Sequence, residues 1–195
     1  VGYFVNPVVL RADFSGNPSF DQFLDRVRQT VLKAFEHQDY PFAMLVQRLR
    51  PERTASHSPL FQVMFNFQKA PRLGEEGLTS FALGEAGARL KLGDLTLEST
   101  ALEQRVAQFD LTLTVAEVDD EIAASLEYNA DLFEEATIKR MAGHFQTLVD
   151  GIIAAPITRV SDLPLLNEAE RKQLLTQWNE TTTNYPSDRC LHELI

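Results

Sequence analysis

Two stretches of alternating apolar and polar residues, separated by a pair of aspartates, constrain the fold of this chain more than any other feature. The apolar residues are Phe109, Leu111, Leu113 and Val115 in the first stretch, and Ile122, Ala124, Leu126 and Tyr128 in the second. Because successive side chains of a β-strand point to opposite faces, each stretch is expected to be a strand with one apolar face. Asp119 and Asp120 suit a two-residue turn, so the sequence predicts an antiparallel β-hairpin.

Two longer stretches repeat apolar residues at intervals of three and four, as amphipathic helices do. These residues are Phe20, Phe23, Leu24, Val27, Val31, Ala34 and Phe35 in the first stretch, and Ile138, Met141, Ala142, Phe145, Leu148, Val149, Ile152 and Ile153 in the second. Asn17 and Pro18 have the residue types of an N-cap and a first helical position, and the helix expected after them spans about five turns, ~30 Å. Pro156 is expected to end the second helix.

The rest of the chain contains shorter predicted elements. In chain order these are a buried strand over residues 1–10, a short helix over 42–49 that Pro51 ends, a strand over 61–67, a long loop over 70–94 with a short strand near Phe81, and a strand over 95–100. Asn167 and Glu170 have the spacing of a capping box and predict a last helix that runs to about Trp178, followed by a linker. Because strands and helices interleave, we expect an α+β fold, an α/β sandwich whose mixed β-sheet is covered by two long helices.

Charge and composition exclude several classes of protein. The net charge is −10, and it is concentrated in residues 73–195, where 22 Asp and Glu face nine Lys and Arg. Such a surface repels nucleic acid. No apolar run approaches the ~18 residues that would span a bilayer, so no membrane is expected as a partner. A single cysteine, Cys190, excludes an internal disulfide and fits a cytoplasmic protein.

A search for catalytic motifs finds no complete set of reactive residues. No phosphate-binding glycine loop and no HExxH motif occurs, and the four histidines are scattered, so neither a nucleotide site nor a metal site is expected. His37 and Asp39 have two interpretations. They are either part of a catalytic relay, or His37 complements the end of one helix while Asp39 caps the next; the residues favour the second.

Five short segments, in order, resemble motifs of the condensation domains of nonribosomal peptide synthetases, which belong to the chloramphenicol acetyltransferase-like superfamily. Residues 1–7, VGYFVNP, resemble the motif IGxFVNT, with Pro7 in place of threonine. Residues 37–42, HQDYPF, match HQDxPF in full. Residues 53–61, RTASHSPLF, are similar to RDxSxxPLF, and the segments FQVMF and FDL complete the set.

This resemblance implies a division of the chain into two parts. Residues 1–157 are expected to be the C-terminal lobe of a condensation domain, one chloramphenicol acetyltransferase-like lobe. Residues 158–195 resemble the linker that leads into an adenylation domain, and the start of that domain, on the strength of Glu170-Arg171, Trp178-Asn179, Tyr185-Pro186 and His192.

Condensation domains of this family have two lobes around a tunnel, where an upstream carrier-bound acyl or peptidyl thioester is joined to the amine of a downstream carrier-bound aminoacyl thioester. The resemblance therefore implies these partners: the N-terminal lobe, two peptidyl carrier proteins and an adenylation domain. It implies no cofactor bound by this chain, since the phosphopantetheine arms belong to the carriers. The family's HHxxxDG motif lies in the N-terminal lobe, and no two adjacent histidines occur here. This chain alone is therefore expected to be inactive.

The resemblance also nominates residues near the tunnel, none of them catalytic. Asn6 is expected near the tunnel, with His37 and Asp39 as its structural supports, and Phe109 and Asp110 near the segment that crosses to the other lobe. Two other functions stay open. One is a non-catalytic docking module for carrier proteins, and the other is an unrelated acyltransferase half that forms homodimers through its edge strands.

Overall fold

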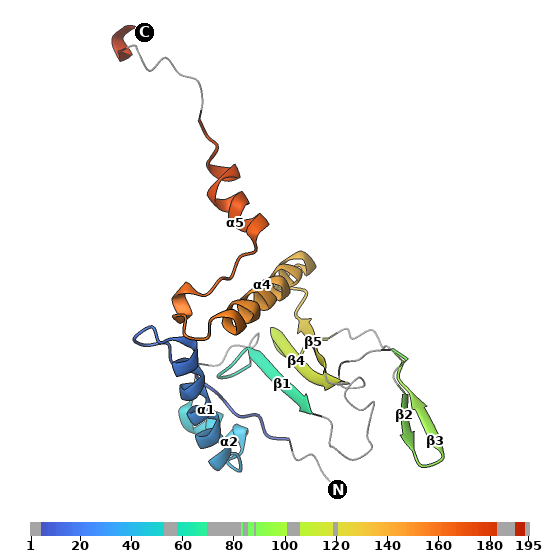
Figure 1. Ribbon diagram of the computed structural model, residues 1–195. Coiled ribbons are helices and arrows are strands. Elements are labelled where there is room, and N and C mark those ends of the chain that lie inside the picture. Colours follow the sequence, from blue (N-terminus) through green and yellow to red (C-terminus); the bar gives the residue numbers. More distant parts are fainter. Residues whose placement is uncertain are drawn as a thin grey trace.

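A mixed three-stranded sheet forms the centre of the computed structural model, with strand order β1-β4-β5 (Figure 1). The strands are β1 Val63–Lys69, β4 Leu111–Val118 and β5 Glu121–Tyr128. The structure describes residues 5–52, 58–69, 83, 86–87, 89–100, 106–118, 121–182 and 190–193. Strand β1 pairs with β4 in parallel, and β4 pairs with β5 in antiparallel register. The predicted mixed sheet and hairpin are confirmed, while the turn residues Asp119 and Asp120 lie outside the described residues.

A second, two-stranded sheet lies in the chain between β1 and β4. It consists of β2 Arg89–Leu92 and β3 Leu95–Glu98, joined at Gly93, whose φ of 62° suits a glycine in a tight turn. Strand β3 confirms the prediction for residues 95–98, but the loop predicted over 70–94 is wrong at β2. The error arose because four residues are too few to show a period of two. The strand predicted near Phe81 lies outside the described residues.

The predicted helices are all present; α2 has the predicted bounds, and the ends of the others are shifted. The α-helices are α1 Phe20–Glu36, α2 Phe42–Leu49, α4 Glu135–Ala154 and α5 Glu168–Leu175, and short 3₁₀ helices follow at Val160–Asp162, Gln177–Asn179 and Leu191–Glu193. The capping box at the start of α5 is formed as predicted, although the α-helix ends at Leu175 and Trp178 lies in a 3₁₀ turn.

Helix α1 begins later than its sequence suggests. Its N-cap is Ser19, not Asn17, and Asn17 has a left-handed backbone with φ of 46°. The first N–H groups of the helix donate to a distant segment, from Phe20 to the Thr158 oxygen at 2.9 Å and from Asp21 to the Pro156 oxygen at 3.0 Å. A partner 135 or more residues away in the chain therefore sets where α1 starts.

The strand predicted over residues 1–10 is wrong in its described part. Residues 5–10 form no strand, and the side chains of Val5 and Leu10 are 66% and 51% exposed. A strand requires a neighbour for its backbone hydrogen bonds, and no described strand lies beside this segment. Residues 1–4 lie outside the described residues.

The two faces of the central sheet differ in how they are covered. Helix α4 contacts β5, and on one face of the sheet Ala116 is fully buried. Adjacent strand residues point to opposite faces. The opposite face therefore carries Phe65 and Phe67, which are 60% and 54% exposed. The apolar side of the predicted strands is thus partly open, at β1 and at Ile122, while the apolar residues of β4 on that side are half-buried.

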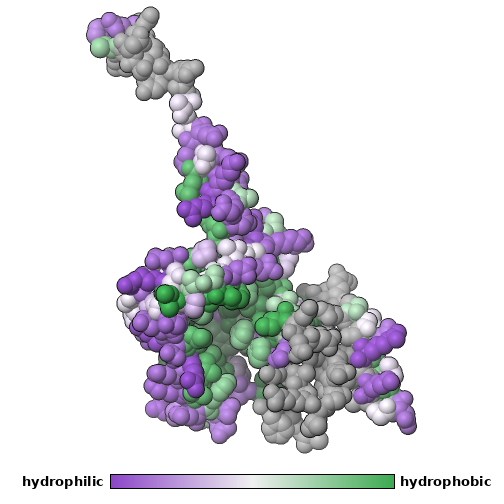
Figure 2. Space-filling model, viewed as in Figure 1, coloured by the Kyte–Doolittle hydropathy of each residue, from purple (hydrophilic) through white to green (hydrophobic). Residues whose placement is uncertain are grey.

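Few side chains are buried in the described part of the chain. They are those of Pro18, Val46, Ala116 and Ile138. Figure 2 shows hydrophobic residues at the surface below α4. No helix in the described part of the chain has the length and apolar character needed to cross a membrane.

Candidate functional site

The side chain of Asn6 holds the turn between α1 and α2. Its Nδ2 donates to the backbone oxygens of Gln38 at 2.7 Å and Tyr40 at 2.9 Å. Its Oδ1 accepts from the N–H of Phe42, the first residue of α2, at 2.9 Å. The asparagine therefore satisfies one of the unpaired N–H groups at a helix start, as an N-cap does, but from 36 residues upstream.

His37 and Asp39 lie in this turn, and both are exposed. His37 is the C-cap of α1, and its N–H donates to the Ala34 oxygen at 3.1 Å. The predicted capping role of Asp39 is wrong, because the N-cap of α2 is Pro41 and the N–H of Phe42 is bonded by Asn6 instead. Because Asn6 already accepts a hydrogen bond from the N–H of Phe42 at the start of α2, no side chain of the adjacent turn is needed as a cap.

A cavity of about 220 Å³ lies between residues 6–9, the end of α1 and the start of α2. Its lining includes the polar side chains of Asn6, His37 and Tyr40 and the apolar side chains of Val9 and Leu45. The structure therefore brings together two of the predicted residues, Asn6 and His37, around one small and mainly apolar space. Asp39 belongs to the same turn but does not line this cavity.

Phe109 and Asp110 lie at the edge where β4 begins. The ring of Phe109 stacks on that of Phe61, with centroids 5.3 Å apart, and Phe61 packs edge-on against Phe42 at 5.4 Å. The backbone of Asp110 donates to the Gln62 oxygen at 3.1 Å and accepts from the N–H of Asn129 at 3.0 Å. Asp110 thus continues the pairing of all three strands at this end of the sheet.

Phe42 connects the two groups of predicted residues. Its N–H is bonded by Asn6, and its ring packs against Phe61, which stacks on Phe109. The sequence interpretation did not select Phe42 or Phe61, although each is the last residue of a recognised motif. Their positions in HQDYPF and RTASHSPLF were the signal that would have identified them.

The described residues contain no cluster of three or more His, Cys, Asp or Glu side chains suited to a metal ion. The site consists of an amide, exposed histidine and tyrosine side chains, and aromatic rings. These groups are suited to hold backbone segments and to line an apolar wall. They do not form a pair of nucleophile and base.

Comparison with known proteins assigns the chain to a family. The family model of the condensation domain matches residues 1–175. The chain belongs to the condensation-domain family. This condensation-domain chain is 43% identical over 197 residues to one of the linear gramicidin synthase proteins of Brevibacillus parabrevis, covering 100% of the chain and 4% of that protein. It is 43% identical over 192 residues to chondramide synthase cmdD of Chondromyces crocatus, covering 98% of the chain and 4% of that protein.

Solved structures of the same fold agree with this assignment. The X-domain from teicoplanin biosynthesis is 26% identical to this condensation-domain chain, with a TM-score of 0.64, and the match covers 80% of the chain and 33% of the X-domain chain. The condensation domain from the Monacolin K polyketide synthase MokA has the same fold, with a TM-score of 0.53 at 17% identity, over 75% of this chain and 31% of that one. The resemblance to condensation domains of nonribosomal peptide synthetases is confirmed, and the chain spans about a third of these solved chains.

Proposed function

We propose that this condensation-domain chain is the C-terminal, acceptor-side lobe of a nonribosomal peptide synthetase condensation domain. In this function it forms half of the tunnel where an upstream carrier-bound acyl or peptidyl thioester meets the amine of a downstream carrier-bound aminoacyl thioester. Residues 1–157 are the lobe, and residues 158–195 are the linker and the start of an adenylation domain. The phosphopantetheine arms come from the carriers, and the chain acts in the cytoplasm.

The open apolar face of the central sheet carries the proposal. Phe65 and Phe67 of β1 and Ile122 of β5 are more than half exposed, and all three point to this face. Exposed apolar side chains gathered on one face of a sheet are typical of an interaction surface. An N-terminal lobe packed over this face would complete a core that the chain lacks alone.

The chemistry assigned to this lobe is positioning. Holding two tethered reactants in one geometry replaces a bimolecular encounter, which is a large catalytic contribution. Asn6 and the α1–α2 turn, together with the Phe42–Phe61–Phe109 cluster, supply a fixed wall for that purpose. The histidine that handles the amine is proposed to come from the other lobe, because no HHxxxDG motif occurs in this sequence.

Reconstitution tests the proposal. The chain is mixed with a separately expressed N-terminal lobe that carries HHxxxDG, and with a donor carrier and an acceptor carrier loaded with their thioesters. We expect a complex of the two lobes and amide-bond formation, detected by mass spectrometry of the acceptor carrier. Binding of carriers without turnover would favour the non-catalytic docking module instead. Amide formation by this chain without the other lobe would refute the proposal.

A matched pair of variants tests the interface. Phe65→Ser removes an apolar ring from the open face, and we expect it to weaken the lobe complex roughly 30-fold, from the loss of about 2 kcal/mol of apolar burial. Leu95→Ser changes a residue of β3 that is similarly exposed but lies outside this sheet, and it should leave the affinity unchanged. Analytical ultracentrifugation measures both. Equal affinities for the two variants would place the interface elsewhere.

A further inference from the structure

The segment after α4 lies beside the start of α1 and is hydrogen-bonded to it. The Asn17 Nδ2 donates to the Ser161 Oγ at 2.8 Å, and the N–H of Ser161 donates to the Asn17 Oδ1 at 3.2 Å. The Arg159 guanidinium donates to the Asn17 backbone oxygen at 3.1 Å. Residues 159–161 are therefore held to the turn before α1 by side-chain bonds in addition to the backbone bonds at the helix start.

A close contact with α4 follows a few residues later. A Cβ atom placed on Gly151 would lie 2.5 Å from the Cγ of Pro164, which is shorter than real Cβ contacts. The proline ring therefore lies directly over the backbone of α4, and only glycine allows this approach. The segment between α4 and α5 is thus held at a second place, the contact of Pro164 with Gly151.

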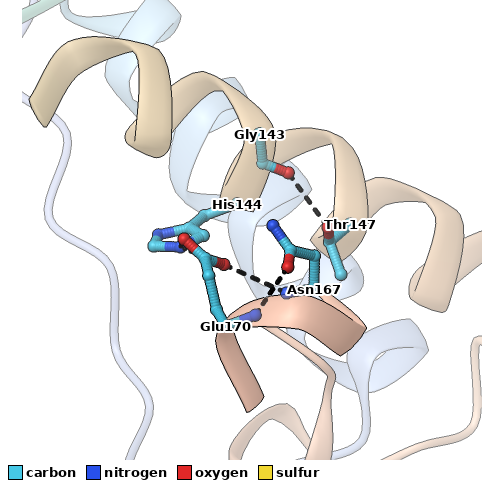
Figure 3. Close-up of polar contacts among 5 residues, drawn as sticks. All are labelled: Gly143, His144, Thr147, Asn167 and Glu170. Carbon is cyan, nitrogen blue, oxygen red and sulfur yellow. Dashed lines mark hydrogen bonds and ion pairs between the residues drawn. The ribbon is translucent and has the colours of Figure 1, made fainter. Parts of the chain in front are cut away.

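The third contact joins α5 itself to α4 (Figure 3). The His144 Nε2 lies 3.0 Å from each carboxylate oxygen of Glu170, and the two side chains are 23% and 21% exposed. The same carboxylate accepts from the N–H of Asn167 at 3.2 Å, while the Asn167 side chain accepts from the N–H of Glu170 at 2.9 Å. One carboxylate therefore completes the capping box of α5 and bonds a histidine of α4.

The charge of Glu170 is stabilised where it lies. Partial burial acts to raise the pKa of its carboxyl, but the Asn167 N–H, the His144 ring and the Arg140 charge together outweigh burial and lower that pKa. The carboxylate is thus held in the ionised form that both contacts need.

We propose that the His144–Glu170 contact is a latch that holds α5 against α4 and so sets the direction in which the chain leaves the condensation fold. Figure 1 shows α5 pointing away from the sheet and its helices. With the latch closed, residues 176–182 extend from the lobe along one direction. In the described part of the chain, no other side-chain hydrogen bond or ion pair joins residues 165–175 to α4. When the His144–Glu170 contact is broken, α5 is therefore free to rotate about the Pro164 contact. This inference concerns the lobe itself and does not rest on the proposed reaction.

Pulsed electron–electron double resonance on the full chain, which measures the distance between two spin labels, tests the latch. The exposed native thiol is removed by Cys190→Ser, and spin labels are placed on two exposed positions, Asp150→Cys of α4 and Gln173→Cys of α5. We expect one narrow distance distribution with His144 intact. His144→Leu, which cannot bond Glu170, should broaden it at least twofold.

Two further variants separate the bond from general damage to α4. His144→Gln keeps a side-chain donor that reaches Glu170, so it should restore most of the narrow distribution. Gln146→Leu changes an exposed residue of the same helix by a similar amount and should have no effect. Thermal unfolding followed by circular dichroism shows that each variant is folded. Broadening in both His144 variants, or in neither, would overturn the proposal.

Discussion

Replacing Asn6 with alanine removes three hydrogen bonds that hold the α1–α2 turn. Two donors to the oxygens of Gln38 and Tyr40 are lost, and so is the acceptor for the N–H of Phe42. Water reaches this turn and partly replaces each lost hydrogen bond, so each bond stabilises the fold by an amount at the low end of the usual range. We take about 0.5 kcal/mol for each bond to a carbonyl oxygen and about 1 kcal/mol for the helix cap. We therefore expect Asn6→Ala to lower the free energy of unfolding by about 2 kcal/mol.

The isosteric variant Asn6→Asp makes this prediction sharper. Aspartate keeps an acceptor for Phe42 but places a charged oxygen where Nδ2 lies 2.7 and 2.9 Å from two carbonyl oxygens. It should therefore destabilise the chain at least as much as alanine, because the repulsion outweighs the retained cap. Gln47→Ala, an exposed change on α2, is the matched control and should have an effect within about 0.5 kcal/mol.

Urea unfolding, followed by circular dichroism, measures all three variants. The slope of the transition should stay the same, so that the change in midpoint reports stability. If Asn6→Asp is as stable as the parent chain, the Nδ2 contacts do not hold the turn. If Asn6→Ala behaves like the Gln47→Ala control, the long-range cap has no energetic value.

Two further predictions concern the segment after α4. Gly151→Ala should destabilise the chain by about 1–3 kcal/mol in urea unfolding, because its Cβ would meet the Pro164 ring at 2.5 Å. Gly143→Ala, whose Cβ would have no atom within 4 Å, should stabilise α4 by up to about 1 kcal/mol. Equal effects of the two changes would refute the Gly151–Pro164 contact. The pKa of the Glu170 carboxyl is lowered. The free energy that this carboxylate contributes to holding α5 against α4 is therefore complete above the ordinary glutamate pKa, and it is lost as the pH falls through the lowered pKa. Hydrogen exchange of α5 should show this loss in the parent chain and not in Glu170→Gln.

Most of the secondary structure was predictable from the sequence, because its signals are local. The alternation around Asp119 and Asp120 predicted the β4–β5 hairpin, and the spacing of apolar residues predicted both long helices. The capping box of Asn167 and Glu170 was predicted in full, since its partners are three residues apart. In each case the interacting groups are near neighbours in the chain.

The candidate site was predicted only in part. The motifs led to Asn6 and His37, which line one cavity, and to Phe109, which stacks on Phe61. They did not reveal that Phe42 links these groups, since a ring contact between distant segments has no pattern in the sequence. Whether these residues border a reaction tunnel stays a prediction.

The sequence by itself determined most of the helices and strands, the family and the absence of an adjacent histidine pair. Only the tertiary structure decided which face of the sheet stays open, where α1 starts and what caps α2. It also paired His144 with a glutamate that the sequence had assigned only to a local cap. The physical reason is the same throughout: these outcomes depend on hydrogen-bond and packing partners tens of residues or more apart, and local periodicity does not encode such distances.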